Sequence, residues 1–347
     1  MRFHPTEEQL AIQDAVRGTL ADSLSAERLH ALVDGDADFD PESWQKLMDL
    51  GLGGLMMPET AGGSALGLVD AAMVIEMCGQ AAAPGPLIDQ IVAGIALSTT
   101  GNAAARDLWC HGIATGERRA ALALGGAWLP ESWNGEARFV TAARSADLFL
   151  VGTPGGGLAV VEAGDGVEIT PVPSSDRTRR LSSVRFDGAR MEEIFAAGDP
   201  AVARIFDAAL VLAAADALGG AQHCLDISVA YAKEREQFGQ PIGRFQALKH
   251  QLATMALEVE PARALLWYAA YAWDAQLPDA PRAAAMAKAH IADRFVSVAR
   301  AAVAAHGGIG YTWEYGLVIW FRRSLYDRAW LGSPAVHRAR AADLATW

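Results

Sequence analysis

The sequence predicts an α+β protein that is mainly helical, with a small antiparallel β domain between two helical regions. Apolar residues recur at helical spacing before residue 118, glycine and proline separate short apolar runs from 119 to 198, and alanine-rich stretches fill the remainder. We therefore expect an N-terminal helical domain (1–118), a middle β domain (119–198) and a C-terminal helical bundle domain (199–347).

The composition limits the classes of protein to which the chain can belong. Of its 347 residues, 52% are hydrophobic, so the chain can bury a large core and is not mainly disordered. The formal net charge of −12 argues against a nucleic-acid partner, which requires a basic face. The three cysteines are too widely spaced for a disulfide framework or a zinc site, and we expect no metal site. Neither an export signal nor an uncharged membrane-spanning run is present, so we expect a cytoplasmic protein without a membrane span.

Capping signals mark the N-terminal helices. Thr6 and Gln9 form a capping box, in which each side chain bonds to the backbone amide of the other residue. Asp40 and Pro41 begin another helix as an N-cap and a first-turn proline. Further helical signals run over residues 68–80 and from Leu87 to about Gly112.

The rest of the chain changes from strands to long helices. In the middle domain, short apolar runs predict strands near residues 121–124, 139–140, 147–151 and 157–163. After residue 199, three alanine-rich helices are expected over residues 201–236, 246–274 and 280–306. Helices of this length favour an antiparallel bundle.

A turn after the first long helix carries the most informative residues. The segment YAKEREQFGQPIGRFQ ends a helix at an Arg-x-Gln-Phe-Gly-x-Pro turn, which we expect Phe238 and Phe245 to bury. Arg235 and Gln237 would present fixed donors beside an aromatic ring, suited to a phosphate and a planar ring. The alternative is a capped corner between two helices with a surface arginine.

A glycine cluster follows the last of the three long helices. In AHGGIGYTWE, Gly307, Gly308 and Gly310 would let a ligand approach the backbone amides closely. The cluster is not a dinucleotide-binding fingerprint, because no strand precedes it. A glycine C-cap of the helix is the alternative interpretation.

Together these segments resemble the acyl-CoA dehydrogenase family, flavoenzymes that oxidise acyl-CoA thioesters to enoyl-CoAs. The resemblance covers nearly the whole chain: TEEQL, WQKLMDLGLGGLMMPETAGG, YAKEREQFGQPIGRFQALKHQLATM and HGGIGYTWE occur in the family's order. It implies a helical N-terminal domain, a middle β domain and a C-terminal four-helix bundle. The segment DRTRRLSSVRFD also resembles the shorter branch that includes sterol side-chain dehydrogenases.

The resemblance implies FAD as the cofactor, bound at a dimer interface to which both subunits contribute. Arg235, Gln237, Phe238, Gly307 and Gly308 would contact the adenosine-pyrophosphate half of the neighbouring subunit's flavin.

Other parts of the family's flavin site are altered in this sequence. Ala304 stands where the family has a glutamine, three residues before the glycine pair. The region from Ala123 to Pro130 lacks the threonine and the acid of the family's Thr-Glu-Pro segment. Thr141 would remain as a flavin contact of the following strand.

The family's reaction needs a carboxylate that removes the α-proton while a hydride leaves the β-carbon. By resemblance, the usual positions of this base correspond to Leu331 and Ala209, which are both apolar, and Leu210 replaces an adjacent arginine. Asp216 is a candidate for a displaced base, although a structural polar contact is the favoured interpretation. Asp207 is interpreted as a partner of the helix dipole. The catalytic residue is therefore left unassigned.

Three functions are compatible with these residues. The first is a subunit of a heteromeric acyl-CoA dehydrogenase, whose longer homologous subunit supplies the base and the flavin-ring contacts. The second is an active homo-oligomer, a dimer or tetramer, with a displaced base; the third is a flavin-free acyl-CoA-binding or scaffold protein. The resemblance to the sterol branch implies an acyl-CoA substrate with a bulky or branched acyl group, such as a steroid side chain. The small side chains of Ala208, Ala209 and Ala213, which would line the pocket, agree with this expectation. An electron-transfer flavoprotein is the expected acceptor.

Overall fold

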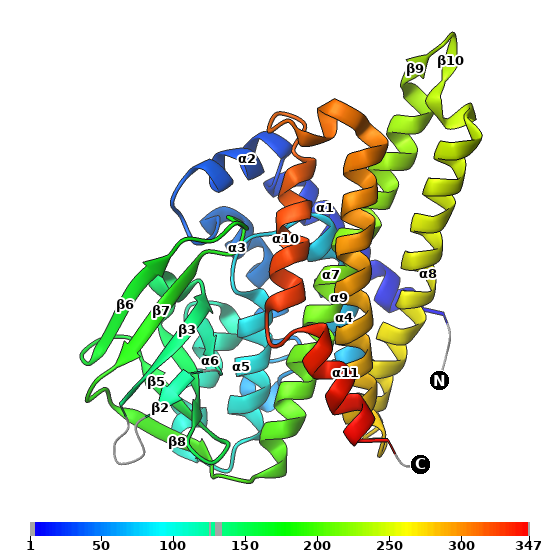
Figure 1. Cartoon of the computed structure of the whole chain (residues 1–347). Coiled ribbons are helices and arrows are strands. Elements are labelled where there is room, and N and C mark those ends of the chain that lie inside the picture. The colour runs from blue at the N-terminus through cyan, green and yellow to red at the C-terminus, as the bar shows by residue number, and fades with distance from the viewer. Residues whose placement is uncertain (1–3, 125, 129–133, 346–347) are drawn as a thin grey trace. The chain divides into compact units, whose positions relative to one another are not determined.

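The computed structural model describes residues 4–124, 126–128 and 134–345, and these residues are mainly helical with a smaller β region, as the sequence predicts (Figure 1). The chain divides into two compact units. One consists of Met1–His30, Ala72–Ala83 and Leu210–Trp347, and the other of Ala31–Ala71 and Pro84–Ala209. The three predicted domains follow a different division, and their boundaries stay a prediction.

The N-terminal helices begin at the predicted capping residues. The amide of Gln9 donates to Thr6 Oγ1 over 3.2 Å, and the amide of Thr6 donates to Gln9 Oε1 over 2.9 Å. The carboxylate of Asp40 accepts from the amide of Ser43 over 2.7 Å. The helices are α1 (Glu7–Ser23), α2 (Ala26–Asp34), α3 (Pro41–Asp49), α4 (Leu68–Gln80), α5 (Leu87–Thr99) and α6 (Ala103–Thr115).

The helical signal from Leu87 to Gly112 corresponds to two helices, α5 and α6. Gly101 lies between them, and Asn102 caps α6 by accepting from the amide of Ala105 over 3.1 Å. A glycine followed by an asparagine is a helix break with a new N-cap, because glycine lowers helix propensity and asparagine bonds to the free amides.

The β region consists of two four-stranded sheets. Their strand orders are β1-β4-β5-β8 and β2-β3-β7-β6. Between them lies an apolar core in which the rings of Phe149 and Phe186 meet edge to face at 5.7 Å. The strands are β1 (Ala120–Ala123), β2 (Gly126–Trp128), β3 (Gly135–Thr141), β4 (Leu148–Thr153), β5 (Gly157–Glu162), β6 (Val167–Val172), β7 (Leu181–Phe186) and β8 (Met191–Phe195).

The prediction of an antiparallel region is confirmed with one exception. Strands β1 and β4 pair in parallel, from Ala120 opposite Leu148 to Ala123 opposite Val151. After β1 the chain crosses to the other sheet, forms β2 and β3, and returns as β4. A crossover of this kind brings two strands together in the same direction.

Gln90 joins α5, α6 and β1. Its fully buried amide nitrogen donates to the carbonyls of Ile113 and Arg118, each over 2.7 Å. Its amide oxygen accepts from the amide of Ala120 over 2.9 Å. One side chain therefore satisfies three backbone groups that would otherwise be buried without partners.

The long C-terminal helices agree with the predicted ones to within two residues at each end. They are α7 (Pro200–Glu234), α8 (Gln246–Asp274) and α9 (Ala280–His306), followed by α10 (Leu317–Ala329) and α11 (Pro334–Asp343). Figure 1 shows α8 and α9 side by side.

Two glycines let α4 and α7 cross closely. A Cβ on Gly79 would lie 2.2 Å from the carbonyl oxygen of Asp216, and one on Gly219 would lie 2.0 Å from that of Glu76. Any larger residue at either position would push the helices apart.

Candidate functional site

A two-stranded hairpin between α7 and α8 carries two of the predicted cofactor contacts, Gln237 and Phe238, and a third, Arg235, directly precedes it. It consists of β9 (Glu236–Gln237) and β10 (Gln240–Pro241), with Phe238 and Gly239 in the turn. Both turn residues have positive φ angles, 54° and 76°. These angles are typical of the type I′ turns that close two-residue hairpins.

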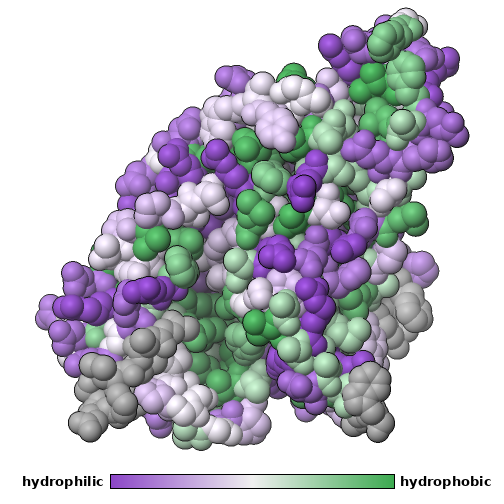
Figure 2. Space-filling view, viewed as in Figure 1, coloured by the Kyte–Doolittle hydropathy of each residue, from purple (hydrophilic) through white to green (hydrophobic). Residues whose placement is uncertain are grey.

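The hairpin presents its side chains to solvent. Arg235, Gln237 and Phe238 are all exposed, and Figure 2 shows apolar atoms beside hydrophilic ones at the end where Figure 1 places β9 and β10. Phe238 is 92% exposed, and its ring and that of Phe245 meet edge to face with centroids 6.0 Å apart, so the prediction that Phe238 buries the turn is wrong. The turn directs this ring away from the bundle. An exposed phenylalanine with a positive φ angle costs free energy in the isolated chain.

The glycine cluster begins where α9 ends. Gly307 has a φ angle of 64° and a ψ angle of −140°, which differs from the left-handed conformation of a common glycine C-cap, and the short helix η5 (Gly307–Tyr311) follows. A Cβ on Gly307 or Gly308 would meet no atom within 4 Å, whereas one on Gly310 would lie 2.7 Å from the carbonyl oxygen of Val303. Packing therefore requires Gly310, while Gly307 and Gly308 leave open space against the backbone.

His306, the last residue of α9, contacts α7, the helix that leads into the hairpin, and directly precedes the glycine cluster. It is 4% exposed, and its ring stacks on Tyr231 of α7 with centroids 4.5 Å apart. Its Nδ1 lies 2.7 Å from the carbonyl oxygen of Ala302, so this nitrogen donates. Burial lowers the pKa of His306, which favours the neutral ring.

Thr141 lies at the end of β3, in the unit that holds the sheets. It is 2% exposed and stands opposite Leu181 of β7, so its hydroxyl is not open to solvent. In the altered segment from Ala123 to Pro130, Gly125, Leu129 and Pro130 lie outside the described residues.

The two positions that the resemblance assigns to the family's base, Ala209 and Leu331, stay a prediction, and the structure shows where each lies. Ala209 is fully buried in α7. Leu331 lies in the turn between α10 and α11 with a φ angle of 57°, and its carbonyl oxygen is 2.9 Å from Nε2 of His337. Gly332 has a φ angle of 107°, and a Cβ there would lie 2.8 Å from the same Nε2.

Asp216 is held in a buried ion pair with Arg323 of α10. The guanidinium donates from Nε to Oδ2 over 2.8 Å and from Nη2 to Oδ1 over 2.7 Å. Because both carboxylate oxygens are engaged, the geometry favours a structural role for Asp216 over that of a base.

Asp207 does not serve the helix dipole. Helix α7 begins at Pro200 and has no acidic residue in its first turn, and Asp207 is buried seven residues further on. The dipole effect is confined to the first turn, so this prediction is wrong.

Two buried ionisable groups lie outside the predicted site. The carboxylate of Asp89 accepts from the amide of Leu122 over 2.9 Å, and burial raises its pKa to about 7 against the opposing charge of Arg179. Lys288 donates to the backbone oxygen of Asp327, and burial lowers its pKa to about 8. In the sequence, each appears only as a polar residue within an apolar run.

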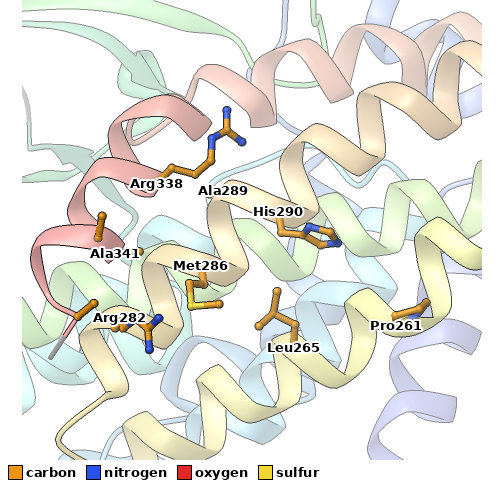
Figure 3. Close-up of a pocket in the computed structure, with 10 residues that line it drawn as sticks. Pro261, Leu265, Arg282, Met286, Ala289, His290, Arg338 and Ala341 are labelled. Carbon is orange, nitrogen blue, oxygen red and sulfur yellow. The ribbon is translucent and has the colours of Figure 1, made fainter. Parts of the chain in front are cut away.

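A cavity of about 430 Å³ opens among α8, α9 and α11 (Figure 3). Arg282, His290 and Arg338 stand around the apolar side chains of Leu265 and Met286. None of the predicted site residues lines it.

Within the described part of the chain, no group of three His, Cys, Asp or Glu side chains could hold a metal ion. No helix of these residues is long and apolar enough to cross a membrane.

Comparison with known proteins finds matches along most of the chain. A family model described as acyl-CoA dehydrogenase, N-terminal domain, matches residues 6–117, and one described as acyl-CoA dehydrogenase, C-terminal domain, matches residues 198–345. The chain is similar to the acyl-CoA dehydrogenase IpdE2 of Mycolicibacterium smegmatis, with 32% identity over 338 residues that cover 95% of this chain and 96% of the relative.

Solved structures show a similar fold. The structure described as the Tcur3481-Tcur3483 steroid ACAD is 31% identical, with a TM-score of 0.90 and 97% of each chain covered. The ChsE4-ChsE5 complex from Mycobacterium tuberculosis is 24% identical, with a TM-score of 0.87, and covers 99% of this chain and 98% of that one. At that identity the second likeness concerns the fold alone.

Proposed function

Because the chain belongs to the acyl-CoA dehydrogenase family, as its motifs predict, we propose that it is one subunit of a heteromeric, FAD-dependent member. In this assembly the chain contributes to a flavin site that it shares with a longer homologous subunit. The longer subunit supplies the carboxylate base and the contacts to the flavin ring. The observation that carries the proposal is that Ala209 and Leu331 replace the base at both family positions, while Arg235 and Phe238 stay exposed on a projecting hairpin.

The residues of the hairpin and the glycine cluster fit the adenosine-pyrophosphate half of FAD. Arg235 offers an exposed guanidinium to the pyrophosphate charge, and the open space at Gly307 and Gly308 allows oxygens to reach the backbone amides. Phe238 offers an exposed aromatic face to a planar ring. All of these groups are exposed on the surface of the chain, where a flavin bound to a partner subunit could reach them.

When bound, FAD accepts the hydride that leaves the β-carbon of the acyl group. The α-proton must pass to a carboxylate at the same site, and Arg323 engages both oxygens of the only candidate that the sequence suggested, Asp216. This chain therefore helps to bind and orient the flavin, and the α-proton passes to a carboxylate of the longer subunit.

The proposed substrate is an acyl-CoA with a bulky acyl group such as a steroid side chain, and the proposed electron acceptor is an electron-transfer flavoprotein. Support for the acyl group comes from the 31% identical structure described as a steroid ACAD. The small side chains of α7 that were expected to line the pocket are buried, since Ala208, Ala209 and Ala213 are at most 1% exposed.

The test compares the chain purified alone with the chain co-expressed with a longer homologue. Bound flavin is measured per protomer after denaturation, and acyl-CoA oxidation is followed with an artificial electron acceptor. We expect little flavin on the lone chain and one flavin per unlike pair in the complex. Arg235→Gln should lower the flavin content of the complex, whereas Arg282→Gln, an exposed arginine of α9, should not.

Two results would overturn the proposal in different directions. One flavin per protomer on the lone chain, together with activity, would favour an active homo-oligomer with a displaced base. A stable complex without flavin would favour a flavin-free scaffold.

A further inference from the structure

We infer that His306 is a positioning residue that joins the hairpin after α7 and the glycine cluster after α9 into one rigid body. The importance of this coupling for the cofactor rests on the proposed function. The coupling itself is a property of the chain and can be measured without a cofactor or a partner.

Two tyrosine rings from different segments contact the ring of His306. Its ring stacks on Tyr231 of α7, with centroids 4.5 Å apart and an interplanar angle of 28°. On another side it contacts Tyr315, which precedes α10, at 4.9 Å, and the two tyrosines meet edge to face at 6.1 Å. These contacts cross between segments that are distant in the sequence.

Backbone hydrogen bonds connect Tyr231 to the base of the hairpin. Its carbonyl oxygen accepts from the amide of Arg235 over 2.8 Å, and the carbonyl oxygen of Arg235 accepts from the amide of Ile242 over 2.7 Å. A displacement of the Tyr231 ring therefore disturbs the bonds that fix the base of the hairpin.

His306 is also connected to the start of the glycine cluster, through the chain and through packing. It is the last residue of α9 and directly precedes Gly307, whose amide donates to Ala304. Gly310 packs back on it so closely that an added Cβ would lie 3.0 Å from the Cβ of His306. The backbone of Gly307 and Gly308 must follow any movement of this residue.

The stacked ring connects the two helices, and Nδ1 donates to the carbonyl oxygen of Ala302 within α9. The backbone of Ile227 in α7 also acts on the imidazole of His306. Since phenylalanine cannot form a hydrogen bond there, rescue by His306→Phe would assign the coupling to the ring. A phenylalanine at position 306 would keep the stacking, whereas an asparagine would keep a donor near the place of Nδ1 but lose the ring.

The experiment is hydrogen–deuterium exchange on the full chain, comparing the wild type with His306→Asn and His306→Phe. Since an aromatic pair contributes about 0.5–1.5 kcal/mol, we expect His306→Asn to raise exchange about two- to tenfold. The increase should occur together in peptides covering 235–242 and 304–311, and His306→Phe should restore the wild-type rates. His250→Asn, which changes an exposed histidine of α8, should alter neither peptide.

Several outcomes would overturn the inference. These are unchanged exchange in His306→Asn, an increase in one peptide alone, or a His306→Phe variant that behaves like His306→Asn. If His306→Asn does not fold, as judged by thermal unfolding, Tyr231→Leu must produce the same joint increase.

The proposed function is separated from this inference by measuring flavin release from the co-expressed complex. If the proposed function and this inference are both correct, the complex with His306→Asn should release flavin faster than the wild type. The complex with His306→Phe should release it at the wild-type rate. Absence of flavin from the wild-type complex would remove the proposed function and leave the exchange result intact.

Discussion

Asp216 of α7 and Arg323 of α10 form a bidentate ion pair, with N–O distances of 2.7 and 2.8 Å, in which neither residue is more than 1% exposed. A guanidinium buried to this extent depends on its carboxylate for charge compensation. The pair therefore ties the two helices together only while both members are present.

Asp216→Asn is expected to lower the free energy of unfolding by about 3–5 kcal/mol, because it leaves the charge of Arg323 uncompensated. Urea unfolding at pH 7 measures the change. Asp226→Asn, on the exposed side of the same helix, should change the free energy by less than about 0.5 kcal/mol. An Asp216→Asn variant with native stability but no activity in the complex would instead identify Asp216 as a base.

The stability of the sheet-containing unit should depend on the ionisation of Asp89. Its pKa is about 7 in the folded chain and near 3.9 in an unfolded one, so the folded state binds more protons between these values. This contribution to stability is present below pH 4 and is lost as the pH rises through 7.

Asp89→Asn removes this titration while its amide oxygen can still accept from Leu122. We expect the variant to be more stable than the wild type by roughly 1–3 kcal/mol at pH 8, with the difference shrinking towards pH 5. Urea unfolding at both pH values measures it, with Asp165→Asn in an exposed turn as the control. A variant less stable than the wild type at pH 8 would show that Arg179 stabilises the charged form.

Two glycine-to-alanine substitutions should separate binding from folding. Gly308 has free space for a Cβ, so Gly308→Ala is expected to change the free energy of unfolding by less than about 0.5 kcal/mol while it weakens flavin binding in the complex. Gly332→Ala places a methyl group 2.8 Å from Nε2 of His337 at a positive φ angle, and should cost about 1–3 kcal/mol. Thermal unfolding and flavin content provide the two readouts. Equal destabilisation by both substitutions would contradict the open space at Gly308.

Phe238 should matter for assembly and not for the stability of the chain. We expect Phe238→Gly to change the free energy of unfolding by less than about 0.5 kcal/mol, because the lost ring is 92% exposed and glycine accepts the positive φ angle. By comparison, Phe149→Ala in the core between the sheets should cost about 3–5 kcal/mol. Flavin content and complex formation, measured by size-exclusion chromatography, should both fall in Phe238→Gly. An unaltered complex would exclude Phe238 from the shared site.

The sequence predicts the long helices well because their signals are local. The capping box at Thr6 and Gln9 marks the start of α1, and long runs rich in alanine and other good helix formers mark α8 and α9, although α8 contains Pro261. It misses β6, which has only half-buried and exposed residues, and β7, where buried residues alternate with less buried ones, because neither forms an apolar run. The parallel pairing of β1 with β4 is also missed, because it arises from a crossover that no local pattern encodes.

For the candidate site, the sequence identifies the segments but not their surroundings. The motif predicts Arg235 and Phe238, yet the outward orientation of Phe238 comes from the turn geometry. Arg323, the partner of Asp216, lies 107 positions away in the chain, and no local sequence pattern predicts a contact between residues so far apart. The same holds for Tyr231 and His306, whose stacking depends on how α7 and α9 pack.

The two compact units differ in how soon the growing chain can complete them during synthesis. The sheet-containing unit is built from Ala31–Ala71 and Pro84–Ala209, so all of its parts exist before the helical bundle has been translated. The other unit needs Met1–His30 and Ala72–Ala83 together with Leu210–Trp347. Its early segments, including α4, must wait for their partners until residues beyond Leu210 have been translated, while the sheet-containing unit folds first. A chaperone that shields nascent apolar segments should therefore engage α4 during translation and release it only after α7 has emerged.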